Sequence, residues 1–280
     1  MADSRSNREA VFKQFPGMTY GNGMDQKRML LNGATSKTLQ KTCFSIGSLL
    51  LSTAVLVACG GDSSSSTAPT LDLKAAQRAY VTGGFSQSGV ISGYCEGTKT
   101  QDFSPTVSGT SIAGLPALIS DETEKDLLVD PTEFCNAFYN SNVGQPDGIE
   151  KIYWDPSTLG LMTDGSSPPN YVYSNLQPFP SSVTVGSKGT ASTYVNYFGK
   201  DEPVTTGALT WTIAADTPTT LLWITVDTAT LISSGELAYT STTTYRLNAD
   251  NTVTALFKTI EAYSGFTQGA GDIVINEKYE

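Results

Sequence analysis

The sequence predicts a mainly β fold, an antiparallel meander that forms a curved sheet or partial barrel with few short helices. Leu209, Trp211 and Ile213 alternate with small or polar residues, so a strand at this position would have one apolar face. The polar turn at 248–251 separates two runs rich in β-branched and aromatic residues, a pattern typical of neighbouring antiparallel strands. Segments that could form helices are sparse.

The N-terminal half of this fold is expected to begin with a few short elements. Residues 71–80 could make two helical turns, and the glycine-broken segment 81–94 is typical of a hairpin. A further helix could lie over the acidic segment 121–130, or directly after it over 131–139 with Asp130 as its N-cap.

Strands are expected through residues 183–263, joined by short polar turns. Alternation predicts one side for Leu237, Tyr239 and Tyr245. It places Phe257 on the apolar side of its strand, beside a surface residue, Lys258. The expected strands are 190–198, 209–213, 219–226, 236–247 and 252–263, and their common core is Leu209, Trp211, Ile213, Trp223, Tyr245 and Phe257.

The N-terminal fifth of the chain is expected to be an export segment. Lys37 and Lys41 precede an uncharged, mostly apolar run over 44–58, which is too short to cross a bilayer but suits a secretory signal. The run ends in Leu56-Val57-Ala58-Cys59, and a Gly/Ser-rich segment typical of flexible linkers follows. The alternative, a buried helix with an incidental cysteine, fits those glycines and serines poorly.

This order of segments resembles the lipobox signal of bacterial lipoproteins. The resemblance implies diacylglycerol on the Cys59 sulfur, cleavage before Cys59 and fatty acylation, such as palmitoylation, of the new amine. Gly60, where inner-membrane lipoproteins carry aspartate, implies an anchor in the outer membrane that faces the periplasm or the cell surface. We expect translation to start at Met24 or Met29 rather than at Met1. The expected division is a cleaved extension and signal over 1–58, a tether over 59–70 and a single mainly-β domain over 71–280.

Composition excludes several kinds of function. The chain has no histidine, which removes Ser-His-Asp and Cys-His catalysis and histidine metal sites. Residues 1–58 hold seven of the 17 basic and three of the 27 acidic residues. Residues 59–280 therefore keep ten basic and 24 acidic residues, a net charge of −14. An acidic surface of this kind argues against nucleic acid as a partner.

Two cysteines remain after the signal and the lipid acceptor are set aside. Cys95 and Cys135 most simply pair with each other in an exported chain. A metal site would need more ligands than two cysteines supply. Closing the loop between them would be worth roughly 4 kcal/mol in the chain-entropy model.

Several segments of the domain resemble an uncharacterised group of proteobacterial lipoproteins. Members carry a Tyr-Tyr-Asp segment, a Leu-Pro-Ser-Val-x-Val-Gly segment and a late Tyr-Arg strand. Trp154 and Phe179 depart from that pattern, and the resemblance implies no activity. The matching segments, besides Cys95, are Ile152-Tyr153-Trp154-Asp155, Phe179-Pro180-Ser181-Ser182-Val183-Thr184-Val185-Gly186 and Thr244-Tyr245-Arg246-Leu247.

Acidic residues offer two further hypotheses. Paired carboxylates can hydrolyse glycosides without histidine, and the candidates near aromatic residues are Asp147, Glu150 and Asp155. A calcium site with oxygen ligands is conceivable at 121–126, among Asp121, Glu122, Glu124 and Asp126. That spacing matches no EF-hand loop, and a solvated helix start is the favoured alternative.

The segment 134–179 is dense in aromatic residues and could carry a loop-borne platform for sugar rings or a peptide. The alternative, which we favour, is that these rings fill the core of the irregular half. The possible ligand platform is Tyr153, Trp154, Tyr171 and Tyr173.

Together these observations favour a lipid-anchored envelope lipoprotein with a non-enzymatic binding or structural role. An alternative is a periplasmic carrier of lipid or another hydrophobic ligand, held in a half-barrel cavity lined by Trp211 and Trp223. A histidine-free glycoside hydrolase is less favoured. The membrane is the expected partner through the acyl anchor, a protein or glycan ligand is left open, and no cofactor or metal is expected.

Overall fold

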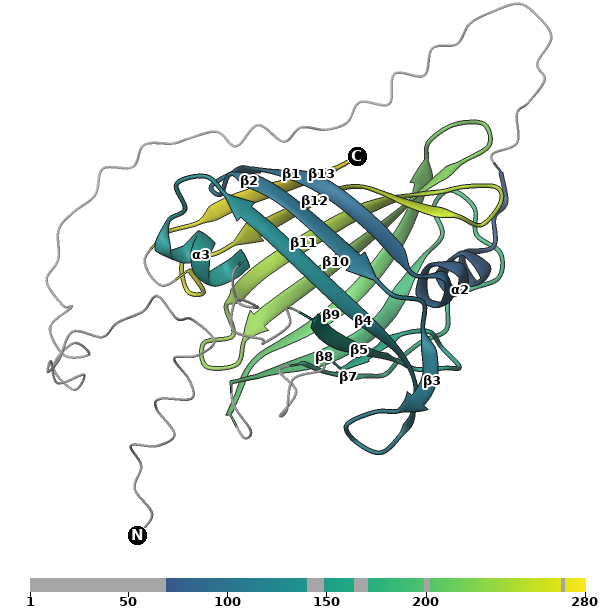
Figure 1. Ribbon diagram of the computed structural model, residues 1–280, viewed down its shortest axis with the longest axis horizontal. Coiled ribbons are helices and arrows are strands. Elements are labelled where there is room, and N and C mark those ends of the chain that lie inside the picture. The colour runs from purple at the N-terminus through teal and green to yellow at the C-terminus, as the bar shows by residue number, and fades with distance from the viewer. Residues whose placement is uncertain (1–68, 140–148, 164–170, 199–201, 268–269) are drawn as a thin grey trace, which may run out of the picture. The chain divides into compact units, whose positions relative to one another are not determined.

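The computed structural model describes residues 69–139, 149–163, 171–198, 202–267 and 270–280. These residues form an antiparallel barrel with two helices (Figure 1). The elements, in chain order, are α2 (Leu73–Gly83), β1 (Phe85–Gly93), β2 (Gly97–Phe103), β3 (Val107–Thr110), β4 (Pro116–Leu128), α3 (Glu133–Tyr139), β5 (Ile149–Trp154), β6 (Leu161–Thr163), β7 (Tyr171–Ser174), β8 (Lys188–Phe198), β9 (Glu202–Ala215), β10 (Leu221–Leu231), β11 (Leu237–Leu247), β12 (Val253–Ala262) and β13 (Ile273–Tyr279).

The sheet closes on itself through the N-terminal strands. From β4 to β13 each strand pairs with the next, β13 then pairs with β1, and β1 pairs with β2. The far edge of β2 pairs with the second half of β4, and β3 pairs with the first half of β4 along that same edge. The predicted mainly β, antiparallel fold is therefore confirmed, and the curved sheet is a closed barrel.

Helix α2 lies at one end of the barrel, and the prediction of a helix over 71–80 is confirmed (Figure 1). The Asp72 side chain caps it by accepting a hydrogen bond from the Ala75 amide at 2.8 Å. Gly84, with φ of 69°, ends it, a conformation that glycine adopts without strain. The predicted hairpin over 81–94 is wrong, because 81–83 continue the helix and 85–93 form the single strand β1.

Helix α3 lies at the other end of the barrel (Figure 1), and it decides between the two alternatives for a second helix. The helix over 131–139 is confirmed in outline, although it begins at Glu133 and Thr132, rather than Asp130, caps it by accepting from the Cys135 amide. The helix over 121–130 is wrong because 116–128 form β4, which pairs on both edges. Neither α2 nor α3, the helices of the described residues, is long and apolar enough to cross a membrane.

The predicted core of the C-terminal half is confirmed in part. Trp211, Ile213 and Trp223 are buried in one cluster with the α2 residues Leu73 and Ala76, and Leu209 and Tyr245 pack against that cluster.

Phe257, in contrast, is 47% exposed, so its predicted burial is wrong. Thr244 pairs with Phe257 and Tyr245 with Ala255, so Leu256 is an extra residue in β12. A bulge of this kind reverses the faces of all residues beyond it, which turns Phe257 outward and Lys258 inward. A second bulge, at Ala238, places Leu237 on the opposite face of the sheet from Tyr239, so the predicted common side of these two residues is wrong.

Candidate functional site

The middle of the barrel carries charged side chains on its inner face. Alternation along β4 turns Glu122, Glu124 and Asp126 to one side, and the register places Asp126 opposite Lys99 of β2. On β13 the same face carries the buried Ile273 and Ile275 and then Glu277, opposite Lys258. We call this set the interior ionic cluster: Lys99, Glu122, Glu124, Asp126, Lys258 and Glu277.

Two members of the interior ionic cluster are almost fully buried. Lys99 is 7% exposed, and its Nζ lies 2.9 Å from Glu124 Oε2 and 4.0 Å from Glu277 Oε1. Glu277 is 1% exposed and accepts hydrogen bonds from the hydroxyls of Tyr139 at 3.0 Å and Tyr279 at 2.6 Å. Buried charges of this kind are stable only when they are paired and hydrogen-bonded.

The Gln101 side chain connects Glu122 with Glu124. Gln101 Nε2 donates to Glu122 Oε1 at 2.5 Å and lies 3.4 Å from Glu124 Oε2, while its Oε1 accepts from Gln87 at 2.7 Å. Two carboxylates thus share one amide donor. The cluster has more carboxylates than lysines to neutralise them.

Because carboxylates outnumber lysines, some carboxyl groups of the cluster have a raised pKa and one has a lowered pKa. Burial tends to raise the pKa of Glu277, but Lys258, Lys99 and the tyrosine hydroxyls outweigh it and lower that pKa to about 2. Burial and then the negative charge of Glu124 raise the pKa of Asp126 to about 8, against the opposing charge of Lys99. Burial also raises the pKa of Glu122. Asp126 Oδ1 is buried and accepts no hydrogen bond from the described residues.

A second polar group, the tyrosine cluster, surrounds Asp227 of β10. The Tyr194 hydroxyl lies 2.7 Å from Asp227 Oδ1 and 2.7 Å from the Tyr239 hydroxyl. The rings of Tyr171 and Tyr173 lie 5.8 and 5.2 Å from the Tyr194 ring. Burial raises the pKa of Asp227. The tyrosine cluster is Tyr171, Tyr173, Tyr194 and Tyr239.

The predicted aromatic platform is divided between different surfaces. Tyr171 and Tyr173 stack with centroids 6.3 Å apart, within the tyrosine cluster. Tyr153 and Trp154 are consecutive in β5 and so face opposite sides of the sheet. Trp154 donates from Nε1 to Ser120 at 3.1 Å, and Tyr153 is buried at 8% exposure. The four rings do not form one platform, because two neighbours in a strand cannot share a face.

The carboxylates proposed for hydrolysis are not brought together either. Asp147 lies outside the described residues, and Glu150 pairs in register with Glu122. Asp155 Oδ1 instead accepts hydrogen bonds from the backbone and side chains of Ser157 and Thr158 in its own turn.

The proposed calcium ligands are divided by the alternation of β4. Asp121 faces outward and pairs with Lys151 at 2.8 Å, whereas Glu122, Glu124 and Asp126 face inward. The favoured alternative, a solvated helix start, is wrong because these residues lie in a strand. Within the described ranges, no three Asp, Glu or Cys side chains are arranged to hold a metal ion.

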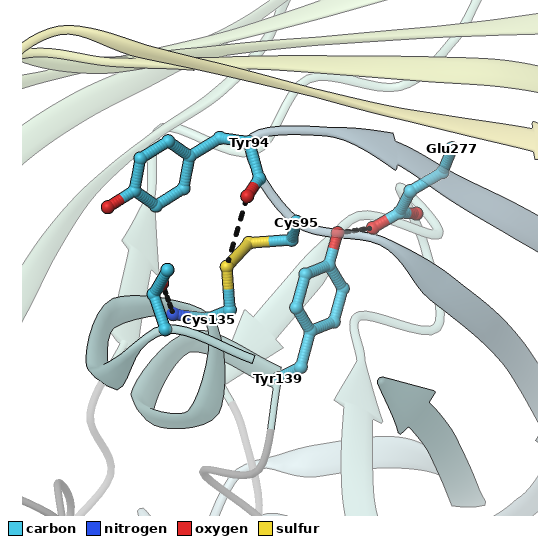
Figure 2. The surroundings of a disulfide bond; sticks show 6 residues. Tyr94, Cys95, Cys135, Tyr139 and Glu277 are labelled. Atoms are coloured by element: carbon cyan, nitrogen blue, oxygen red, sulfur yellow. Dashed lines mark hydrogen bonds between the residues drawn. A yellow bond between two sulfur atoms is a disulfide. The ribbon is translucent and has the colours of Figure 1, made fainter. Parts of the chain in front are cut away.

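Cys95 and Cys135 are joined as the sequence predicts, with their Cα atoms 5.7 Å apart (Figure 2). The bond connects the turn between β1 and β2 to the first turn of α3. Cys59, the predicted lipid acceptor, lies outside the described residues, so its acylation stays a prediction.

Sequence inspection missed several residues of the site. The missed residues lie far apart along the chain, and closure of the barrel brings them together. They are Lys99, Tyr139, Lys258, Glu277 and Tyr279. One usable signal is the alternation of Ile273, Ile275 and Glu277, which puts a charge on an otherwise apolar strand face. No family model, curated protein or solved structure matches this chain.

Proposed function

We propose that this chain is a lipid-anchored, non-enzymatic binding protein of the cell envelope that holds a small organic cation inside its barrel. The binding surface is the interior ionic cluster, with Asp126 as the principal contact. The anchor at Cys59 comes from the sequence, and it would keep the barrel at the outer membrane.

The observation that carries the proposal is the buried Oδ1 of Asp126, a side chain that otherwise shares a hydrogen bond with Glu124. Its Oδ1 is buried without a hydrogen-bond donor, and its pKa is raised to about 8. The raised pKa means that the carboxyl group keeps its proton at neutral pH. A cation that donates a hydrogen bond to the ionised group would stabilise the carboxylate in place of that proton. An ammonium or guanidinium group supplies both the charge and the donors.

The neighbouring rings favour the same class of ligand. Lys99 Nζ already lies 5.8 Å from the centroid of the Tyr139 ring, a distance at which a cation is attracted to an aromatic face. The hydroxyl of Tyr279 lies against Glu277 in the same cluster. Carboxylates combined with tyrosine faces are a suitable lining for an organic cation.

The hydrophobic-carrier alternative has less support. Trp211 and Trp223, its expected cavity lining, pack against Phe179 and the buried residues of α2. The inner face beyond them carries charged groups, and transferring a fatty chain beside charges is unfavourable.

Calorimetric titration of the purified chain tests the proposal. Spermidine, choline and arginine amide are the cationic probes, and palmitate is the apolar one. We expect saturable binding of at least one cationic probe. Asp126→Asn should weaken it at least tenfold, because a hydrogen bond to a charged group is worth roughly 1.5 to 3 kcal/mol.

The matched control is Asp102→Asn, which removes the same charge from an exposed residue of β2. It should leave the affinity unchanged. Binding of palmitate but of no cationic probe would instead support the carrier. Equal weakening by both variants would mean that only the overall charge matters, and the assignment to Asp126 would be wrong.

A further inference from the structure

Helix α3 and its disulfide occupy the barrel end beside the interior ionic cluster. Cys95 and Cys135 are 2% and 1% exposed, so the covalent link lies within the packed end of the barrel. Ile91, Ile260, Ile273 and Ile275 pack around it, with the α3 rings of Phe134 and Phe138 against them. Figure 2 shows α3 below the disulfide, with the Tyr139 side chain extending past Cys95 toward Glu277.

Tyr139, in the last turn of α3, contacts both charges of the buried ion pair. Its hydroxyl donates to Glu277 Oε1 at 3.0 Å, and its ring lies 5.8 Å from Lys99 Nζ. Tyr139 itself is 4% exposed. Moving this one side chain would therefore uncover Lys99 and Glu277 together.

The two ends of the barrel are held differently. Helix α2 has eleven residues and an apolar face. Backbone hydrogen bonds near its start join Leu71 to Val183 and Lys74 to Pro180. Helix α3 has seven residues, fewer than an isolated helix needs to be stable. The disulfide lies in its first turn and the Glu277 contact in its last. Besides the apolar packing of its rings, the helix therefore has a covalent pivot at one end and a breakable hydrogen bond at the other.

We propose that α3 is a lid on the interior ionic cluster, which pivots at the Cys95–Cys135 disulfide and admits the ligand when Tyr139 leaves Glu277. The inference rests on the proposed function for the identity of the ligand, but the opening of α3 can be measured without one. The disulfide keeps the open lid attached, and α2 keeps the opposite end closed.

Hydrogen exchange of the full, oxidised chain measures the opening directly. The amides of 133–139 should exchange faster than those of β13 under native conditions, because the lid opens without unfolding of the barrel. Tyr139→Phe should speed exchange in α3 about tenfold or more and leave β13 unchanged, since it removes one hydrogen bond to a charged group. Spermidine should also associate about tenfold faster with this variant.

The matched control is Tyr263→Phe, which removes a tyrosine hydroxyl that lies 3.1 Å from Glu261 on the outside of the barrel. It should change neither measurement. Exchange of α3 only together with β13 would overturn the lid, and so would local opening of α3 without any change in spermidine association. Absence of binding by spermidine, choline and arginine amide alike would contradict the proposed function, while the exchange data would still decide whether α3 opens.

Discussion

Replacing Trp211 by alanine is expected to lower the free energy of unfolding by about 3 to 5 kcal/mol, the usual cost of deleting a buried indole. Trp211 is 7% exposed, and its ring lies 6.0 Å from that of Phe179. It also lies so close to Gly189 that a Cβ there would come within 2.8 Å of the indole. Alanine would leave a cavity in the core cluster that also contains Leu73 and Ala76 of α2.

Guanidinium titrations followed by far-ultraviolet circular dichroism measure this loss. The control is Lys278→Ala, since Lys278 is exposed and faces outward from β13. Lys258, which simple alternation places on the surface, is unsuitable because the bulge in β12 turns it toward Glu277. Equal midpoints for Trp211→Ala and Lys278→Ala would show that Trp211 is not part of the core.

Replacing Glu277 by alanine is expected to cost about 3 to 5 kcal/mol at pH 7, because it removes a buried carboxylate together with its ion pairs and its hydrogen bonds. Lys99 would keep Glu124, but the hydroxyls of Tyr139 and Tyr279 would lose their acceptor. The pKa of Glu277 is lowered to about 2 in the folded chain. Its contribution is therefore complete above its ordinary value and is lost as the pH falls through about 2.

Chemical denaturation at a series of pH values checks both parts of this expectation. The difference in unfolding free energy between the native chain and Glu277→Ala should be largest at pH 7 and should shrink as the pH falls from about 4.5 toward 2. A difference that does not vary with pH would mean that Glu277 acts through packing alone.

Much of the fold follows from local sequence. The alternation around Trp211, the helix near residue 73 and the pairing of Cys95 with Cys135 all depend on neighbouring residues or on simple elimination. The bulge at Leu256 does not follow from local sequence, because no residue near Phe257 indicates that one residue of the strand is unpaired. Closure of the barrel cannot be predicted from local sequence either, since it depends on a register between β2 and β4 that only long-range packing selects.

The site was harder to predict for the same reason. Glu122, Glu124 and Asp126 do show a period of two, but three acidic residues in a row of alternate positions are more typical of a solvated surface. Only the closed barrel reveals that they face Lys99 and Glu277. A charged residue at the apolar positions of a strand, as at Glu277, is the one feature of the sequence that indicates a charge inside the barrel.

The proposed site is tested most directly by counting the protons released when spermidine binds. Asp126, with a pKa of about 8, is mostly protonated at pH 7, so a cation bound to its carboxylate must displace that proton. Calorimetric titrations at pH 7 in two buffers with different ionisation enthalpies give the number. We predict that the native chain releases a proton when spermidine binds and that Asp126→Asn releases none. Binding without proton release by the native chain, or the same release by the variant, would contradict the assignment of Asp126 as the cation site.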